Sequence, residues 1–139
     1  MNGNNFVKFF LQTPLHVFMG DTMLITVTGC KTGRKYTTPV GFYRDRDILW
    51  IISSRDRTWW RNVDGGADVE MRIHGKDVTG FAKAILDEET VAKQVLEYVR
   101  QIPMSAKAMG VRVENGEPHP EDAARLARER LFVKVKLNE

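Results

Sequence analysis

The spacing of apolar and polar residues predicts a chain built mostly of short strands. Six segments either alternate between apolar and polar residues or are rich in β-branched residues, as strands are. They cover residues 23–28, 36–43, 48–54, 68–74, 78–86 and 131–137. The segment ILWIISS at 48–54 is apolar on both faces, which predicts a central strand.

Helical spacing is present in three places. Residues 88–102 carry one apolar face and are followed by a proline, and residues 121–130 form a shorter, charged helix. Residues 6–18 hold a third apolar stripe, which Pro14 interrupts or kinks. Residues 104–118 show no regular pattern.

The order of these elements predicts the fold class. Five strands joined by short turns, then a helix, then a closing strand are typical of an α+β domain with a small antiparallel barrel of about six strands and flanking helices. Closing the barrel would also remove exposed strand edges. The length of 139 residues predicts a single domain spanning 1–139.

Composition narrows the class of protein. The chain is 42% hydrophobic and 28% charged, as ordinary globular domains are. With 21 basic and 18 acidic residues its net charge is +3, which leans toward anionic partners too weakly to indicate a nucleic-acid-binding protein. The single cysteine allows no intrachain disulfide, and we find neither a signal peptide nor a membrane-spanning run. We expect a cytoplasmic protein.

The stretch TGCKTGRKYTTPV at residues 28–40 is the first candidate for chemistry. Lys31, Arg34 and Lys35 gather at one predicted hairpin tip, where glycines leave backbone N–H groups open to an anion. Lysine and arginine both suit phosphate, although a cationic tip is also common simply because it is solvated.

A proline and a glycine interrupt the strand that leaves this tip. Pro39 has no N–H to give to a sheet, so it belongs at an edge, at a bulge or beside a cavity. Gly41 then removes a side chain. Together, Pro39 and Gly41 indicate a stretch of backbone that a flat molecule can approach. The alternative is an edge strand with a kink.

Polar residues and two tryptophans follow the third strand. Ser53, Ser54 and Arg55 supply hydroxyls and a cation, and Trp59 and Trp60 come shortly afterwards. Two adjacent indoles are hard to bury together, so one could cover a ring system while the other packs; alternatively both pack at the barrel mouth.

The histidines (His16, His74 and His119) are scattered without metal-ligand spacing, and no metal site is predicted.

Taken together, three segments resemble the deazaflavin-dependent nitroreductase family of split-barrel flavoproteins. They are TGCKTGRKYTTPV, FYRDRDILWIISSR and WWRNV, and the similarity covers about residues 22–86. The family pattern is G-R-K-[ST]-G, then P-L, then a strand ending in S-K-G-G, then W-Y-x-N-L. The positions that match are Lys31, Thr32, Gly33, Pro39, Val40, Ser54, Arg55, Trp59, Trp60 and Asn62.

The resemblance implies a split β-barrel that binds F420, a phosphate-rich deazaflavin, in a groove. It implies an oxidoreductase of the nitroreductase or quinone reductase type that transfers a hydride between the deazaflavin and a small planar acceptor, as a monomer or homodimer. The lysine loop and the Ser-Arg segment would hold the phosphates, and backbone near Pro39 would line the ring. The candidate cofactor-binding residues are Lys31, Thr32, Thr37, Thr38, Pro39, Val40, Ser53, Ser54, Arg55, Trp59, Trp60 and Asn62.

Ser54 is also the candidate catalytic residue, as a hydrogen-bond donor to the ring or the substrate. A serine hydroxyl is a poor acid, so solvent is the alternative source of a proton.

Departures from the family pattern keep alternatives open. The glycine pair after Ser-Lys is absent, and residues 55–58 make a shorter connection, so FMN is the alternative cofactor. No tyrosine follows Tyr98, so the substrate need not be a nitroaromatic compound. Two other functions fit less of the pattern: a protein that binds a flavin-like ligand without turnover, and a small barrel that binds nucleic acid through interleaved cations and aromatic rings.

Overall fold

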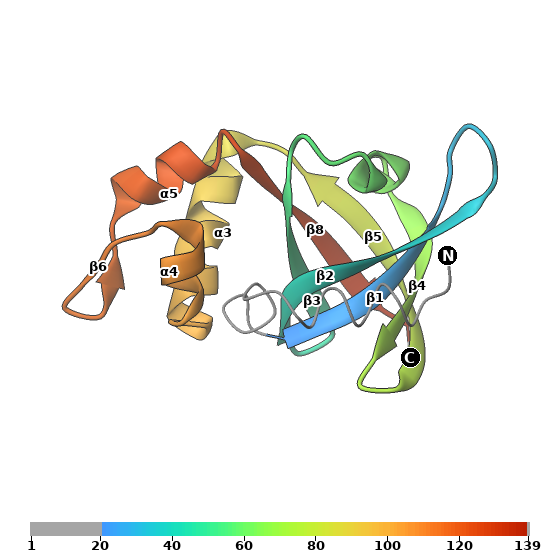
Figure 1. Ribbon diagram of the computed structural model, residues 1–139, viewed down its shortest axis with the longest axis horizontal. Coiled ribbons are helices and arrows are strands. Elements are labelled where there is room, and N and C mark those ends of the chain that lie inside the picture. Colours follow the sequence, from blue (N-terminus) through green and yellow to red (C-terminus); the bar gives the residue numbers. More distant parts are fainter. Residues whose placement is uncertain (1–20, 139) are drawn as a thin grey trace.

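Six antiparallel strands close into a barrel in the computed structural model, which describes residues 21–138 (Figure 1). Around the barrel the strands follow the order β1-β2-β3-β8-β5-β4, and β4 returns to pair with β1. The bounds are β1 (Asp21–Thr28), β2 (Lys35–Asp45), β3 (Ile48–Ser54), β4 (Ala67–Ile73), β5 (Lys76–Ile85) and β8 (Arg130–Leu137). The predicted α+β class and six-stranded antiparallel barrel are confirmed.

Alternation along each strand fills the barrel interior. Met23, Ile25 and Val27 point inward from β1 and are almost fully buried, while the residues between them face outward. Inward-facing residues of all six strands join them in one cluster, and β8 supplies Leu131, Val133 and Val135. This packed interior leaves the outer faces and the ends of the barrel as places for a ligand.

Three helices cover one outer flank of the barrel and lie together in Figure 1. They are α3 (Glu88–Gln101), α4 (Ser105–Met109) and α5 (Pro120–Leu126). Asp87 caps α3 by accepting a hydrogen bond from the backbone N–H of Thr90, 2.9 Å away. The buried face of α3 packs against Phe132 and Ile52 of the barrel in a second apolar cluster.

Three short elements fall in stretches that the sequence pattern left without structure, and one of them is α4 in the region 104–118. A 3₁₀ helix, η1 (Trp59–Val63), lies inside the connection at 55–66. A two-stranded hairpin, β6 (Val113–Glu114) with β7 (Glu117–Pro118), lies beside α4 in the region 104–118. Asn115 and Gly116 turn this hairpin with φ angles of 53° and 78°, and an Asn-Gly pair is the sequence signal that identifies such a turn.

The other predicted elements are confirmed to within a few residues. The exception is the second helix, which ends at Leu126, so that a turn separates it from β8. The predicted helical stripe at 6–18 and His16 lie outside the described residues. None of the helices within residues 21–138 is long and apolar enough to cross a membrane.

Candidate functional site

The barrel is split between β2 and β3. Pairing of β2 with β3 begins only at Gly41, opposite Ile52, whereas pairing of β2 with β1 runs from Lys35 onward. Beyond Ile52, β3 continues beside β8 and away from β2. Residues 35–40 therefore have no second strand partner within the described chain, and backbone groups along that edge are left open.

Pro39 lies on this open edge. It is half-buried, and a residue without an N–H is tolerated there because no neighbouring strand needs the donor. Thr38 and Val40 flank it; the side chain of Val40 belongs to the barrel core, so only its backbone can border the split. The prediction that Pro39 marks an interruption in the sheet is met by this geometry.

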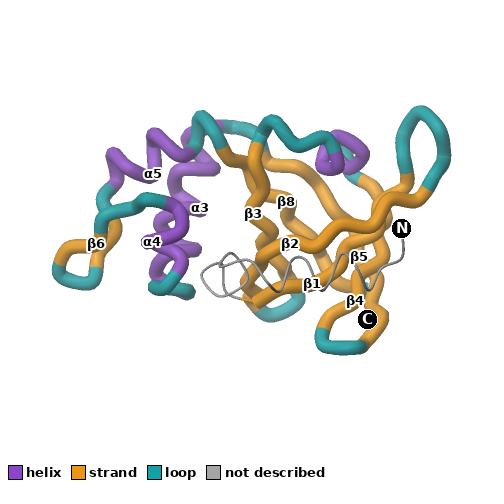
Figure 2. The backbone as a smooth tube through the Cα atoms, in the orientation of Figure 1, coloured by secondary structure: helices purple, strands orange, loops and turns teal. Residues whose placement is uncertain are grey.

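The cationic loop between β1 and β2 stands at the end of this edge and projects from the barrel beside η1 (Figure 2). Backbone hydrogen bonds close the loop internally, from Gly29 N to Arg34 O at 2.6 Å and from Gly33 N to Gly29 O at 2.9 Å. Gly33 has a φ of 73°, which a glycine adopts without strain. Lys31 is exposed and makes no ion pair with any residue between 21 and 138.

Asn62 of η1 ties this loop to the body of the barrel. Its Oδ1 accepts a hydrogen bond from the backbone N–H of Cys30 at 3.1 Å, and its Nδ2 donates to the carbonyl of Trp59 at 3.1 Å. The two family motifs that contain Lys31 and Asn62 are thus physically joined. Asn62 positions the residue next to Lys31.

Tyr36 supports the same loop and was not among the predicted cofactor residues. Its ring is 46% exposed, and its hydroxyl lies 3.4 Å from Thr32 Oγ1. A Cβ added to Gly29 would lie 2.8 Å from Tyr36 Cε2 and 2.9 Å from Thr32 Oγ1, so a larger residue there would have to displace these two side chains. The signal in the sequence is an aromatic residue directly after Lys35, at the end of the cationic stretch.

The end of β3 places its three polar residues in different surroundings. Ser53 is buried, and its Oγ accepts a hydrogen bond from Trp59 Nε1 at 3.0 Å. Ser54 is half-buried, and its hydroxyl donates to Asp56 Oδ1 at 2.5 Å. The Arg55 guanidinium donates to the carbonyls of Leu86 and Ala127, on the side of β5 and α5.

Both adjacent tryptophans are buried at the barrel end. Trp59 and Trp60 are 7% and 5% exposed and belong to the barrel core cluster, which is the alternative in which both indoles pack. Trp60 Nε1 has no hydrogen-bond partner in the described chain, and the Arg61 guanidinium lies 4.9 Å from its ring centroid. Direct contact of either indole with a cofactor stays a prediction.

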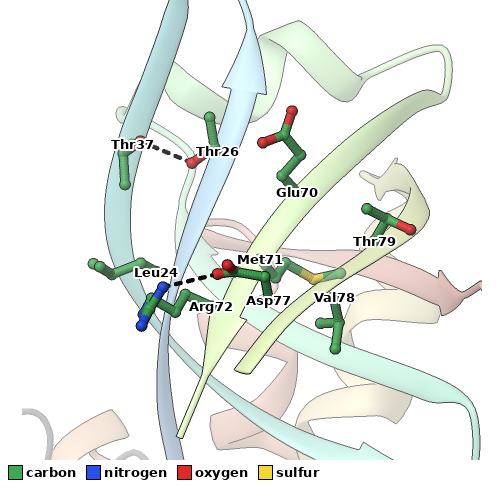
Figure 3. Close-up of a pocket in the computed structure, with 9 residues that line it drawn as sticks. All are labelled: Leu24, Thr26, Thr37, Glu70, Met71, Arg72, Asp77, Val78 and Thr79. Carbon is green, nitrogen blue, oxygen red and sulfur yellow. Dashed lines mark hydrogen bonds and ion pairs between the residues drawn. The ribbon is translucent and has the colours of Figure 1, made fainter. Parts of the chain in front are cut away.

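A groove of about 410 Å³ lies on the outer face of β1, β2, β4 and β5 (Figure 3). Thr37 lines it, because successive residues of β2 alternate between faces and Thr37 points away from Thr38. The polar residues here largely satisfy one another: Thr37 Oγ1 lies 2.8 Å from Thr26 Oγ1, and Lys35 Nζ lies 2.7 Å from Glu70 Oε1. The groove therefore offers little to an anion.

The buried tyrosines Tyr43 and Tyr98 lie in the apolar cluster between the helices and the barrel. Burial raises the pKa of Tyr43 to about 12, although a hydrogen bond with Gln94 acts in the opposite direction. Burial also raises the pKa of Tyr98, which packs edge-on against the ring of Tyr43. Both hydroxyls stay protonated at neutral pH.

The predicted site residues thus fall into three groups. Lys31, Thr32 and Asn62 meet at the cationic loop. Thr38, Pro39, Val40, Ser53 and Ser54 come from the two strand segments at the split, with Trp59 hydrogen-bonded to Ser53 and Trp60 packed beside it. Arg55 and Thr37 point elsewhere, Arg55 toward Leu86 and Ala127 and Thr37 into the outer groove.

The residues at the split fit an anionic, ring-bearing cofactor. Four cations, Lys31 and Arg34 in the β1–β2 loop, Arg57 in the turn after β3 and Arg61 in η1, make no ion pair with any described residue. Unpaired cations suit phosphate and carboxylate groups, and the open edge at Pro39 suits a flat ring. Among the described residues no group of three or more His, Cys, Asp or Glu side chains is placed to hold a metal ion.

Comparison with known proteins identifies a family. The sequence model of the F420H(2)-dependent quinone reductase family matches residues 11–114, which is most of the chain. No curated protein sequence matches the chain significantly.

Solved structures with the same fold include an F420 reductase, 14% identical, with a TM-score of 0.52 over 85% of this chain and 86% of that one. An F420-H2 dependent reductase, FDR-A, is 18% identical, with a TM-score of 0.53 over 83% of this chain and 93% of that one. A FAD and heme binding protein from Mycobacterium smegmatis is 14% identical, with a TM-score of 0.50 over 84% of this chain and 60% of that one.

Proposed function

The chain belongs to the F420H(2)-dependent quinone reductase family, and we propose that it catalyses hydride transfer from reduced F420 to a quinone-like acceptor at the split between β2 and β3. Family membership makes it an F420-dependent oxidoreductase. The acceptor and the residues that hold the cofactor are the proposal.

The observation that carries the proposal is the joint between the cationic loop and the open strand edge. Asn62 fixes the backbone beside Lys31, and the strand that leaves the loop is the one whose edge stays unpaired around Pro39. A phosphate-bearing tail and a flat ring are parts of one molecule, so their two binding surfaces must be contiguous. Here they lie on one continuous stretch of chain.

Each surface supports a different part of the cofactor. Lys31 would bind phosphate as a point charge, together with neighbouring cations that make no ion pair with any described residue. Thr38, Pro39 and the backbone of Val40 would border the ring. Bound F420 supplies the hydride chemistry, and the protein's own contribution is binding, orientation and electrostatics.

Proton supply follows from the same geometry. Reducing a quinone to a hydroquinone requires one hydride and one proton. The hydroxyl of Ser54 already donates to Asp56, so it is available to a ligand as a hydrogen-bond acceptor, or as a donor once that bond is exchanged. Because a serine hydroxyl is a weak acid, we assign the proton to solvent and give Ser54 an orienting role.

The test is to mix the purified protein anaerobically with reduced F420 and a naphthoquinone such as menadione, and to follow oxidation of the deazaflavin by absorbance. We expect turnover with F420 and not with reduced FMN. Lys31→Ala should raise the KM for F420 about 10- to 100-fold, which corresponds to one lost charge-assisted hydrogen bond. Its melting temperature should stay near that of the wild type, since Lys31 is exposed and has no described ion-pair partner.

Two results would contradict the proposal. If FMN supports turnover and F420 does not, the cofactor assignment is wrong. If the protein binds reduced F420 but none of several quinones, enones and nitro compounds oxidises it, the assignment of a planar acceptor is wrong.

A further inference from the structure

Arg55 occupies the position where the related family motif has its phosphate-binding lysine, yet its side chain is used inside the fold. Its Nη2 donates to Leu86 O at 2.6 Å and to Ala127 O at 2.8 Å, and its Nε donates to Ala127 O at 3.1 Å. The backbone N–H of Arg55 also donates to Glu129 O at 2.9 Å. Arg55 thereby joins the end of β3 to the ends of β5 and α5, and its loss would leave two carbonyls without these donors.

Arg57 lies two residues further on, and no hydrogen bond joins its side chain to a backbone carbonyl of the described residues. Its side chain is exposed, and its Nη2 donates one hydrogen bond, to Thr38 Oγ1 at 3.2 Å. Its backbone N–H donates to Ser54 O at 3.2 Å, which closes a tight turn and directs the chain back toward β2. The guanidinium therefore reaches across the split, from the loop after β3 to the open edge of β2.

The charge of Arg57 is uncompensated at that place. Thr38 offers only a neutral hydroxyl, and no Asp or Glu among residues 21–138 forms an ion pair with Arg57. An arginine fork with most of its donors unused binds a phosphate through two parallel hydrogen bonds more strongly than it binds a hydroxyl.

The geometry points to Arg57, and not Arg55, as the residue that binds the phosphate of F420 from the β3 side of the split, while Arg55 holds the barrel and helices together. This inference rests on the proposed function.

The test measures cofactor binding directly. F420 is titrated into wild type, Arg57→Gln and Arg46→Asn, with the fluorescence of the deazaflavin as the readout, and the titration is repeated with the deazaflavin riboside that lacks the phosphate and the anionic tail. Arg46→Asn removes the same charge at the β2–β3 turn, where φ is 60° and asparagine is well tolerated. That turn lies about 20 Å away along the seven residues of β3, beyond the Debye length at physiological salt.

We expect Arg57→Gln to weaken F420 binding about 10- to 100-fold and to leave binding of the riboside unchanged. Arg46→Asn should stay within about twofold of wild type for both ligands. The loss caused by Arg57→Gln should shrink as salt is added. Arg55→Lys should lower the melting temperature and leave the F420 affinity of the folded protein near that of wild type.

Several results would overturn the assignment. If Arg57→Gln binds F420 as tightly as wild type does, Arg57 does not bind the phosphate. If the variant binds F420 and the riboside more weakly by the same factor, Arg57 acts through the shape of the split and not through the phosphate. If Arg55→Lys has the melting temperature of wild type but a tenfold lower affinity for F420, then Arg55 binds the phosphate. If wild type itself fails to bind F420, the proposed function fails and this inference fails with it.

Discussion

Replacing Asn62 by alanine tests how the cationic loop is positioned. The substitution removes two hydrogen bonds of 3.1 Å, one from Cys30 N and one to Trp59 O. At a net 0.5–1.5 kcal/mol each, the free energy of unfolding should fall by about 1–3 kcal/mol. For a domain of this length, that lowers the melting temperature by about 3–10 °C.

The effect on cofactor affinity has a separate size. The loop keeps its internal bonds between Gly29, Gly33 and Arg34, so only its attachment to η1 is lost. Binding would have to re-order the backbone of about one residue, which costs about 1–2 kcal/mol. The Kd for F420 should therefore rise about 5- to 30-fold.

The assay pairs thermal unfolding with fluorescence titration of F420 at a temperature where every variant is folded. Val63→Ala is the matched control, because Val63 is buried in the same 3₁₀ helix and takes part in neither hydrogen bond of the loop attachment. It should lower the melting temperature by a similar amount and leave the Kd unchanged. If Asn62→Ala lowers the melting temperature and binds F420 as tightly as wild type, then Asn62 stabilises the fold without positioning Lys31.

Two further predictions concern the fold that carries the site. Gly80→Ala should destabilise the barrel by about 1–3 kcal/mol in chemical unfolding, because the added Cβ would lie 2.7 Å from the backbone oxygen of Lys136. Gly65→Ala is the control and should be near neutral, because its Cβ enters open space. Equal effects of the two substitutions would contradict the packing of β5 on β8. A side-chain hydrogen bond from Arg112 holds the pKa of the buried Asp122 well below its usual range. The pair therefore stabilises the fold at pH values above about 4, the pKa of an aspartate in the unfolded chain. This stabilisation is lost as the pH falls through the lowered pKa of the folded state. The difference in melting temperature between wild type and Asp122→Asn should thus shrink from pH 6 to pH 2, and a difference that stays constant over this range would count against the assignment.

Strand periodicity predicted the barrel because each strand has one inward face. The alternation around Ile25 and Val133 is the direct consequence of burying one side of a pleated strand, and it is visible without any knowledge of pairing. The hairpin at Asn115 and Gly116 was missed, because its strands of two residues are too short to show a period, although the Asn-Gly pair was a signal for its turn.

The site was harder to predict because it depends on contacts between segments far apart in the sequence. The sequence indicates that Arg55 and Arg57 are both cations near the end of a strand, and nothing in their spacing tells which one meets the carbonyls of Leu86 and Ala127. Those acceptors lie 31 and 72 residues away along the chain. Strand alternation alone places Thr37 and Thr38 on opposite faces, but the pattern could not tell which of the two lines the outer groove until the register of β2 on β1 was known.

The loop at Lys31 and the open edge at Pro39 are proposed to form one surface for a deazaflavin with an anionic tail, and titration of the purified protein with F420 and, separately, with FMN measures this binding. We expect saturable binding of F420 with a Kd in the micromolar range, about −8 kcal/mol, that weakens with added salt and with Lys31→Ala. No saturation below about 1 mM F420, or binding indifferent to both salt and Lys31, would contradict it.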